Sequence, residues 1–279
     1  MQFNSNKLTR DEILSRYFPH YAPAAAQLTG LSGGSCLISD GRHSLVLRQR
    51  HQATSSPFLR QYRALKRVPD DLGPRPSHWL GDWMAVEFIT GEVKETLPDI
   101  IPLVDLLNTL HHQPLFGWRI SLLPLLERYW LECSPSRRTV LWLRQLQALR
   151  RQGEPRPLRM APLHMDIHAG NLVHGADGLR LIDWEYAGDG DVAMELASVW
   201  TETEAQRDRL VAAYATRAAI DPETLRRQVR RWKPWIAMLM VGWYESRWQQ
   251  TGDRQFITLA DAIWRPLSFK GKERSVWVR

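Results

Sequence analysis

Short runs in which apolar and polar positions alternate dominate the first third of the chain, and this period of two predicts β-strands. The first two runs are separated by Asp40-Gly41 and the next two by Gly81-Asp82, both turn-forming dipeptides. We therefore expect antiparallel hairpins here. The predicted strands cover residues 36–39, 44–49, 77–80 and 83–89.

Helical spacing of apolar residues prevails after Thr90-Gly91. The pattern predicts helices over residues 103–111, 122–130, 137–151 and from 192 to near the end, with one hairpin, 171–174 and 179–182, among them. Two earlier helices are expected at 10–17, opened by a Thr9–Glu12 capping box, and at 58–67. The fold class is thus α+β: a β-rich lobe over residues 1–89, a hinge near 87–92, and a helical lobe over 90–279. Ligands commonly bind between such lobes.

The composition predicts a packed core, and the charge pattern argues against a nucleic-acid-binding protein. Of the 279 residues, 44% are hydrophobic and 24% are charged, as in globular domains. The net charge of +7 admits a nucleic-acid partner, but the densest basic group reads best as a solvated helix face, and no zinc-finger or RRM motif accompanies it. We expect no nucleic-acid partner. That basic group comprises Arg226, Arg227, Arg230, Arg231 and Lys233.

Localisation is predicted to be cytoplasmic. The first seven residues are polar and unlike a signal peptide. The longest apolar run, near residues 235–244, is too short to cross a bilayer and predicts a buried helix, so no membrane partner is expected. Cys36 and Cys133 could pair, but two cysteines in a chain without an export signal favour free thiols.

The informative chemistry lies in residues 163–186. Asp166 is followed five residues later by Asn171, and Asp183 stands at the far end of the predicted hairpin. Transfer of a phosphoryl group to a hydroxyl needs a carboxylate that orients or accepts the proton, and hard oxygen ligands for magnesium. Asp166 fits the base, and Asn171 and Asp183 fit the metal ligands. The alternative is a loop without catalytic function, in which Asp and Asn only form hydrogen bonds to the backbone of turns and helix caps.

Two histidines in the same segment allow other interpretations. His164 and His168 are four residues apart and would bind zinc from one helix face, but Gly170 and its turn-forming neighbours argue against a helix there. For His164 we expect a hydrogen bond that braces the loop. For His168, loop bracing and substrate contact are equally favoured.

Residues 164–171, together with Ile182-Asp183-Trp184-Glu185-Tyr186, resemble the catalytic signature of the aminoglycoside phosphotransferase and choline kinase superfamily. The resemblance implies a protein-kinase-like two-lobed fold, an antiparallel sheet in the small lobe, and ATP and Mg²⁺ as cofactors. It extends along nearly the whole chain. The stretches 30–35, 58–65, 116–120 and 163–187 look most similar to the bacterial thiamine kinases, which implies ATP and thiamine as substrates in thiamine salvage.

The resemblance also places a nucleotide site. Gly30, Gly33, Gly34 and Ser35 fall at the phosphate-covering loop, and the backbone of Glu87 and Ile89 falls at the adenine edge. Arg48 stands where the family has a phosphate-binding Lys, and Gln61 stands where it has the Glu that holds this cation. Gln61 is expected to orient Arg48 by a neutral hydrogen bond. These departures support one alternative, a non-catalytic binding protein on the same fold, whereas the complete Asp and Asn set favours a kinase.

The remaining expectations concern the acceptor and the helix after the hairpin. A thiazolium cation favours aromatic faces and a carboxylate, so Trp184, Glu185 and His168 are predicted near the substrate. Choline, ethanolamine or an aminoglycoside would suit much of the same set. Glu195 is expected to brace the catalytic loop, and Asp191 to cap the helix that carries it.

Overall fold

The computed structural model describes residues 8–24, 35–50 and 58–269, and it divides into two compact units that are interleaved along the chain. Unit 1 comprises Met1–Phe116 and Asp166–Ala187, and unit 2 comprises Gly117–Met165 and Gly188–Arg279. The sequence therefore returns to unit 1 for the segment that holds the candidate chemistry. The division into lobes at residue 89 stays a prediction.

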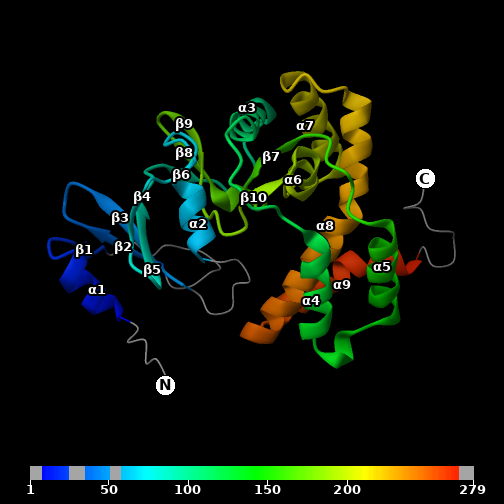
Figure 1. Cartoon of the computed structure of the whole chain (residues 1–279), viewed down its shortest axis with the longest axis horizontal. Helices are drawn as coiled ribbons and strands as arrows, with labels where there is room; N and C mark the ends of the chain where they lie inside the picture. Colours follow the sequence, from blue (N-terminus) through cyan, green and yellow to red (C-terminus); the bar gives the residue numbers. More distant parts are fainter. Residues whose placement is uncertain (1–7, 25–34, 51–57, 270–279) are drawn as a thin grey trace. The chain divides into compact units, whose positions relative to one another are not determined.

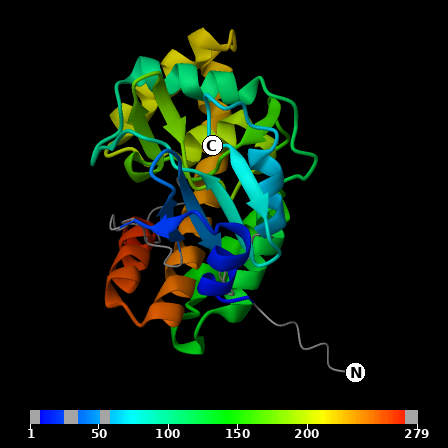
Figure 2. The ribbon, with the colours of Figure 1, turned by 90° about the vertical axis from the view of Figure 1, so that its left-hand side faces the viewer.

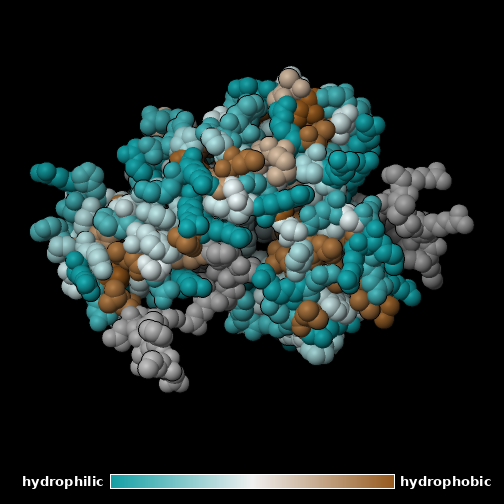
Figure 3. All heavy atoms as spheres, in the orientation of Figure 1, coloured by the Kyte–Doolittle hydropathy of each residue, from teal (hydrophilic) through white to brown (hydrophobic). Residues whose placement is uncertain are grey.

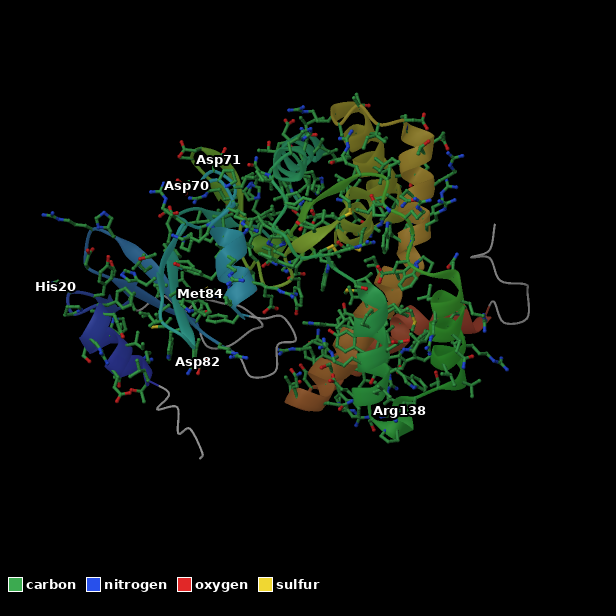
Figure 4. The ribbon with its side chains drawn as sticks, viewed as in Figure 1. His20, Asp70, Asp71, Asp82, Met84 and Arg138 are labelled. Carbon is green, nitrogen blue, oxygen red and sulfur yellow. The ribbon has the colours of Figure 1, made fainter. Side chains whose placement is uncertain are left out.

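A five-stranded antiparallel sheet with the order β1-β2-β3-β5-β4 forms the first part of unit 1 (Figure 1). The predicted hairpin at Asp40-Gly41 is confirmed: the Asp40 carboxylate accepts the N–H groups of Arg42 and His43, and Gly41 has a φ of 88°. Figure 4 marks Met84 on β5, the strand between β3 and β4. The strands are β1 (Ala22–Pro23), β2 (Ser35–Ser39), β3 (Ser44–Gln49), β4 (Pro76–Trp79) and β5 (Trp83–Glu87).

Helix α1 (Arg10–Tyr17) packs its apolar side on this sheet (Figure 2). The Thr9–Glu12 capping box that starts it is formed as predicted. Ile13 is fully buried against residues of β2, β3 and β5, so burial of one apolar stripe fixes the helix on the sheet. The second helix of this region, α2 (Phe58–Leu65), ends two residues before the predicted end.

A second, three-stranded sheet has the order β6-β8-β9. It joins the linker after the first sheet, which contains β6, to the hairpin formed by β8 and β9. Its strands are β6 (Glu92–Val93), β8 (Leu172–Gly175) and β9 (Gly178–Leu181), and helix α3 (Ile100–His111) contacts β9. Gly91 precedes β6, and a Cβ there would lie 2.6 Å from the carbonyl oxygen of His174. Only glycine lets the linker approach the hairpin this closely.

Unit 2 is mainly helical, and helix α8 contacts most of its other helices. Trp232 and Trp235 are buried on α8, so these two rings belong to the core. Helix α8 continues through Pro234. The elements are α4 (Leu122–Glu132), α5 (Val140–Gln152), β7 (Met160–Leu163), β10 (Gly188–Asp191), α6 (Val192–Ser198), α7 (Glu204–Arg217), α8 (Pro222–Thr251) and α9 (Arg254–Phe269).

The helix predicted over residues 137–151 begins at Val140. Pro135–Arg137 form a 3₁₀ turn, and the Thr139 hydroxyl then caps α5 by accepting the N–H of Trp142 at 3.1 Å. Figure 4 labels Arg138 in this connection, where its guanidinium donates to two backbone carbonyls at the end of α4.

Three observations concern the polarity of the helices and of the surface. No helix among the described residues is sufficiently long and apolar to cross a bilayer. On the face drawn in Figure 3, hydrophobic atoms form separate small patches bordered by hydrophilic ones. In the basic group on α8, Arg226 pairs with Glu223 and Lys233 pairs with Glu204, as expected for a solvated helix face.

Both cysteines are free, as predicted, but their environments differ. Burial and the nearby Glu245 charge raise the pKa of the Cys133 thiol to about 11, whereas Cys36 is partly exposed on β2. The thiolate is the reactive form. We expect iodoacetamide at pH 7.5 to label Cys36 and spare Cys133 in the folded chain, as measured by peptide mass spectrometry. Full labelling of both thiols in guanidinium is the control, and equal labelling in the folded chain would contradict the burial of Cys133.

Candidate active site

Asp166 and Asn171 are joined within one tight turn of unit 1. The Asn171 side-chain amide donates to both the backbone oxygen and the Oδ2 of Asp166, each at 2.9 Å. His168 stands at the start of the intervening 3₁₀ turn and accepts the N–H of Gly170 at 3.1 Å through Nδ1. Its Nε2 lies 3.7 Å from the Asp166 carboxylate. His168 therefore braces the loop, while its predicted contact with substrate stays a prediction.

The hairpin β8–β9 brings the second aspartate to this turn. Leu172 is opposite Leu181, and the N–H of Ile182 donates to the Asn171 backbone oxygen at 3.0 Å. Asp183 follows directly with a φ of 64°, a left-handed conformation that Asp tolerates better than most side chains. Local pairing thus sets Asn171 beside the segment that carries Asp183, although they are twelve residues apart in the sequence.

Strand β3 supplies the cation of the site. Arg48 donates from Nη2 to Oδ1 of Asp183 at 2.7 Å, and both side chains are largely buried. Ser35 is directly opposite Arg48 in the β2–β3 register, whereas Gly30, Gly33 and Gly34 lie outside the described residues.

Among the described residues, the hydrogen bond that Arg48 was expected to donate to the side-chain oxygen of Gln61 is not found, and the guanidinium donates to Asp183 instead. Gln61 is 4% exposed, and within the described part of the chain its Nε2 has no partner. Asp183 takes the place that Gln61 was expected to fill, because a carboxylate attracts a guanidinium more strongly than a neutral amide does.

Glu185 faces the same group of charges. Burial and the negative charge of Asp183 raise its pKa to about 6, with a smaller contribution from Asp166, against the lowering effects of Tyr186 and Arg48. Three carboxylates and one guanidinium therefore influence one another in this part of unit 1. Such a concentration of interacting titratable groups is typical of functional sites.

Trp184 has a packing role. Its side chain is 1% exposed, its indole N–H donates to the Leu181 carbonyl at 2.9 Å, and its ring packs against Gly73 and Phe116. The prediction that Trp184 contacts a substrate is therefore corrected, because a buried ring has no free face to offer. Its burial instead anchors the backbone between Asp183 and Glu185.

The predicted adenine-binding segment is held by a residue that the sequence analysis missed. Arg180 on β9 donates to the Glu87 carboxylate at 3.0 Å and to the Gly73 carbonyl at 2.7 Å. The N–H of Glu87 donates to Arg75, while the N–H of Ile89 has no backbone partner within the described residues. The sequence contained one signal for this residue. Arg180 lies between Leu179 and Leu181 in an alternating strand, so its side chain is on the opposite face from the two leucines.

The segment of unit 2 that leads into Asp166 is braced by buried carboxylates. Oε1 of Glu195 accepts the N–H groups of His164 and Met165 at 2.8 and 2.6 Å, and Met165 has a φ of 68°. Glu195 thus braces the loop, as predicted. Asp191 caps α6 through Ala193, also as predicted.

The donor set fits a hard divalent cation that is shared with phosphate. Within the described residues, no group of three or more His, Cys, Asp or Glu could hold a metal without other ligands. Magnesium needs no such group, since it keeps waters and binds through one or two carboxylates plus substrate phosphates. The Asn171 amide nitrogen faces Asp166, which leaves its oxygen for a cation, and Asp183 adds a charged oxygen ligand.

This fold and this group of side chains define a protein-kinase-like phosphotransferase, and the chain belongs to the phosphotransferase enzyme family, whose model matches residues 30–232. A protein named thiamine kinase from Escherichia coli K12 is 59% identical over 273 residues, 97% of this chain and 100% of the relative. A thiamine kinase from Salmonella typhimurium is 58% identical, covering 96% and 98%.

Solved structures confirm the fold class. The choline kinase LicA from Streptococcus pneumoniae has a TM-score of 0.70 and 14% identity over 92% of this chain and 96% of its own. LicA has also been solved in complex with AMP. The antiparallel sheet of unit 1 and the helical unit 2 therefore correspond to a known kinase-like architecture, as the sequence predicted.

Proposed function

We propose that this enzyme is a thiamine kinase, which transfers the γ-phosphoryl group of ATP to the hydroxyl of thiamine and yields thiamine phosphate and ADP. The observation that carries the reaction type is the Asp166–Asn171 turn, with Asp183 placed beside it by the β8–β9 register. The choice of thiamine is supported by the near-full-length likeness to relatives that bear this name.

Asp166 orients the acceptor hydroxyl and accepts its proton. The Asn171 amide donates to Oδ2 of Asp166, so this oxygen is held in place and the other carboxylate oxygen is directed to the hydroxyl. Positioning contributes much of the rate in phosphoryl transfer, because the transition state demands little covalent help from the protein.

Asn171 and Asp183 would hold Mg²⁺ through side-chain oxygens. When bound, the ion supplies charge neutralisation on the β- and γ-phosphate oxygens. The protein's part is to fix both ligands on short rigid segments, the 3₁₀ turn and the residue after β9.

The nucleotide contacts come from the first part of the chain. Arg48 keeps a permanent positive charge and a planar fork that can bind phosphate oxygens bidentately. Gly33, Gly34 and Ser35 would cover the phosphates, and the backbone of Glu87 and Ile89 would bind the adenine edge. The Arg180–Glu87 contact supports this last assignment, since it holds the segment on the hairpin.

The test is a substrate panel. Purified enzyme with Mg²⁺ and ATP is offered thiamine, choline, ethanolamine and an aminoglycoside, and ADP release and the phosphorylated product are measured. We expect thiamine to give kcat/KM at least about tenfold above each other acceptor, equivalent to about 1.4 kcal/mol of transition-state discrimination. Preference for another alcohol, or ATP consumption without thiamine phosphate, would contradict the proposal.

A further inference from the structure

The ion pair of Arg48 engages the carboxylate that the proposed function assigns to magnesium. One guanidinium nitrogen lies 2.7 Å from Oδ1 of Asp183. The exposed fractions of the two side chains are only 17% and 23%, so salt and solvent screen the pair less than a surface pair. Arg48 is therefore a strong competitor for an oxygen ligand of the metal.

The residue that was expected to pair with Arg48 lies on α2 and is not a carboxylate. The eight residues of α2 contain no Asp or Glu, and Gln61 on this helix is buried and neutral. With no carboxylate on α2, the guanidinium pairs with one from the segment after β9. The competition thus follows from the pairing of Arg48 with Asp183 in this chain.

We infer that Arg48 and a divalent cation bind Asp183 in competition, so that metal binding at Asp183 releases Arg48 for the phosphates of the nucleotide. The inference depends on the proposed function for its assignment of Asp183. Two cations at one carboxylate oxygen repel each other. If the ion pair with Arg48 lowers the affinity of Asp183 for the metal by some factor, the bound metal must weaken the Arg48–Asp183 ion pair by the same factor. Arg48 is then a positioning residue for Asp183 and a ligand for phosphate.

The inference predicts effects of opposite sign from one substitution. In Arg48→Gln the competing cation is gone, so Mn²⁺ alone should bind about tenfold more tightly, within the usual range of coupling between two sites. ATP in saturating Mn²⁺ should bind about tenfold more weakly, because a charge-assisted phosphate contact is lost. A residue that only stabilises the fold would weaken both.

The experiment is a Mn²⁺ titration of the full chain without nucleotide, with free Mn²⁺ measured by electron paramagnetic resonance, followed by ATP titration at saturating Mn²⁺. Arg50→Gln is the matched control, because Arg50 is close to Arg48 in sequence but is exposed and pairs with Asp82, which Figure 4 labels before β5. It removes the same charge and should leave the Mn²⁺ affinity within about twofold, since exposed charges are screened. Arg48→Lys retains the cation and should also stay within about twofold.

Tighter Mn²⁺ binding in Arg48→Gln that disappears when Asp183→Asn is added supports the inference. Unchanged or weaker Mn²⁺ binding in Arg48→Gln overturns it, as does an equal gain in Arg50→Gln or Arg48→Lys, or a gain that persists in the double variant. The titrations contain no acceptor alcohol. A chain that fails to phosphorylate thiamine but shows the opposite shifts would lose the proposed substrate and keep this inference.

Discussion

Asp166→Ala is expected to lower kcat by roughly 10²- to 10⁴-fold, the usual contribution of a positioned general base. The loss follows from removing the carboxylate that Asn171 orients, while Arg48 and Asp183 remain for the nucleotide. Steady-state kinetics with ATP and thiamine measure it, and nucleotide titration should show retained binding.

Asp177→Ala is the matched control for this variant. Asp177 is exposed in the turn of the β8–β9 hairpin, so the same side chain is removed from the same segment without touching Asp166. We expect its kcat to stay within about twofold, as for most surface substitutions. A kcat of Asp166→Ala within tenfold of the parent would exclude the assigned base.

Arg137→Ala is expected to lower the free energy of unfolding by about 3–5 kcal/mol, the typical cost of stranding one partner of a buried pair. Glu245 is 1% exposed, and Arg137 donates to it at 2.6 and 2.9 Å and to Asp261 at 2.6 Å. These contacts connect the α4–α5 segment with α8 and α9. Urea denaturation followed by tryptophan fluorescence measures the loss.

Two further variants separate the buried charge from ordinary packing. Arg150→Ala removes an exposed pair with Glu127, 3.6 Å apart between α5 and α4, and should cost about 0–1 kcal/mol. The double variant Arg137→Met with Glu245→Leu should be much more stable than Arg137→Ala, because it contains no buried carboxylate without a partner. An equal loss for Arg137→Ala and Arg150→Ala would contradict the account.

Much of the fold could be predicted from local patterns. The helix at residues 10–17 and the hairpin at Asp40-Gly41 are set by a capping box and a turn dipeptide, so neighbours in sequence decide them. Strands β6, β7 and β10 were missed because each has two to four residues, too few for a period to be visible. Helix α5 starts later than predicted, because Pro135–Arg137 form a separate 3₁₀ turn and Thr139 is the N-cap of the helix.

The sequence by itself determined the spacing of Asp166, Asn171 and Asp183, since one tight turn and one hairpin are local structures that fix how these residues meet. Only the tertiary structure decided that Arg48 pairs with Asp183, 135 residues away, and that Trp184 is buried against Gly73 and Phe116. The physical reason is that a charge or a ring in an exposed local segment has no preferred partner. A buried side chain can no longer interact with water, so its partner must be one of the protein groups that the fold places beside it.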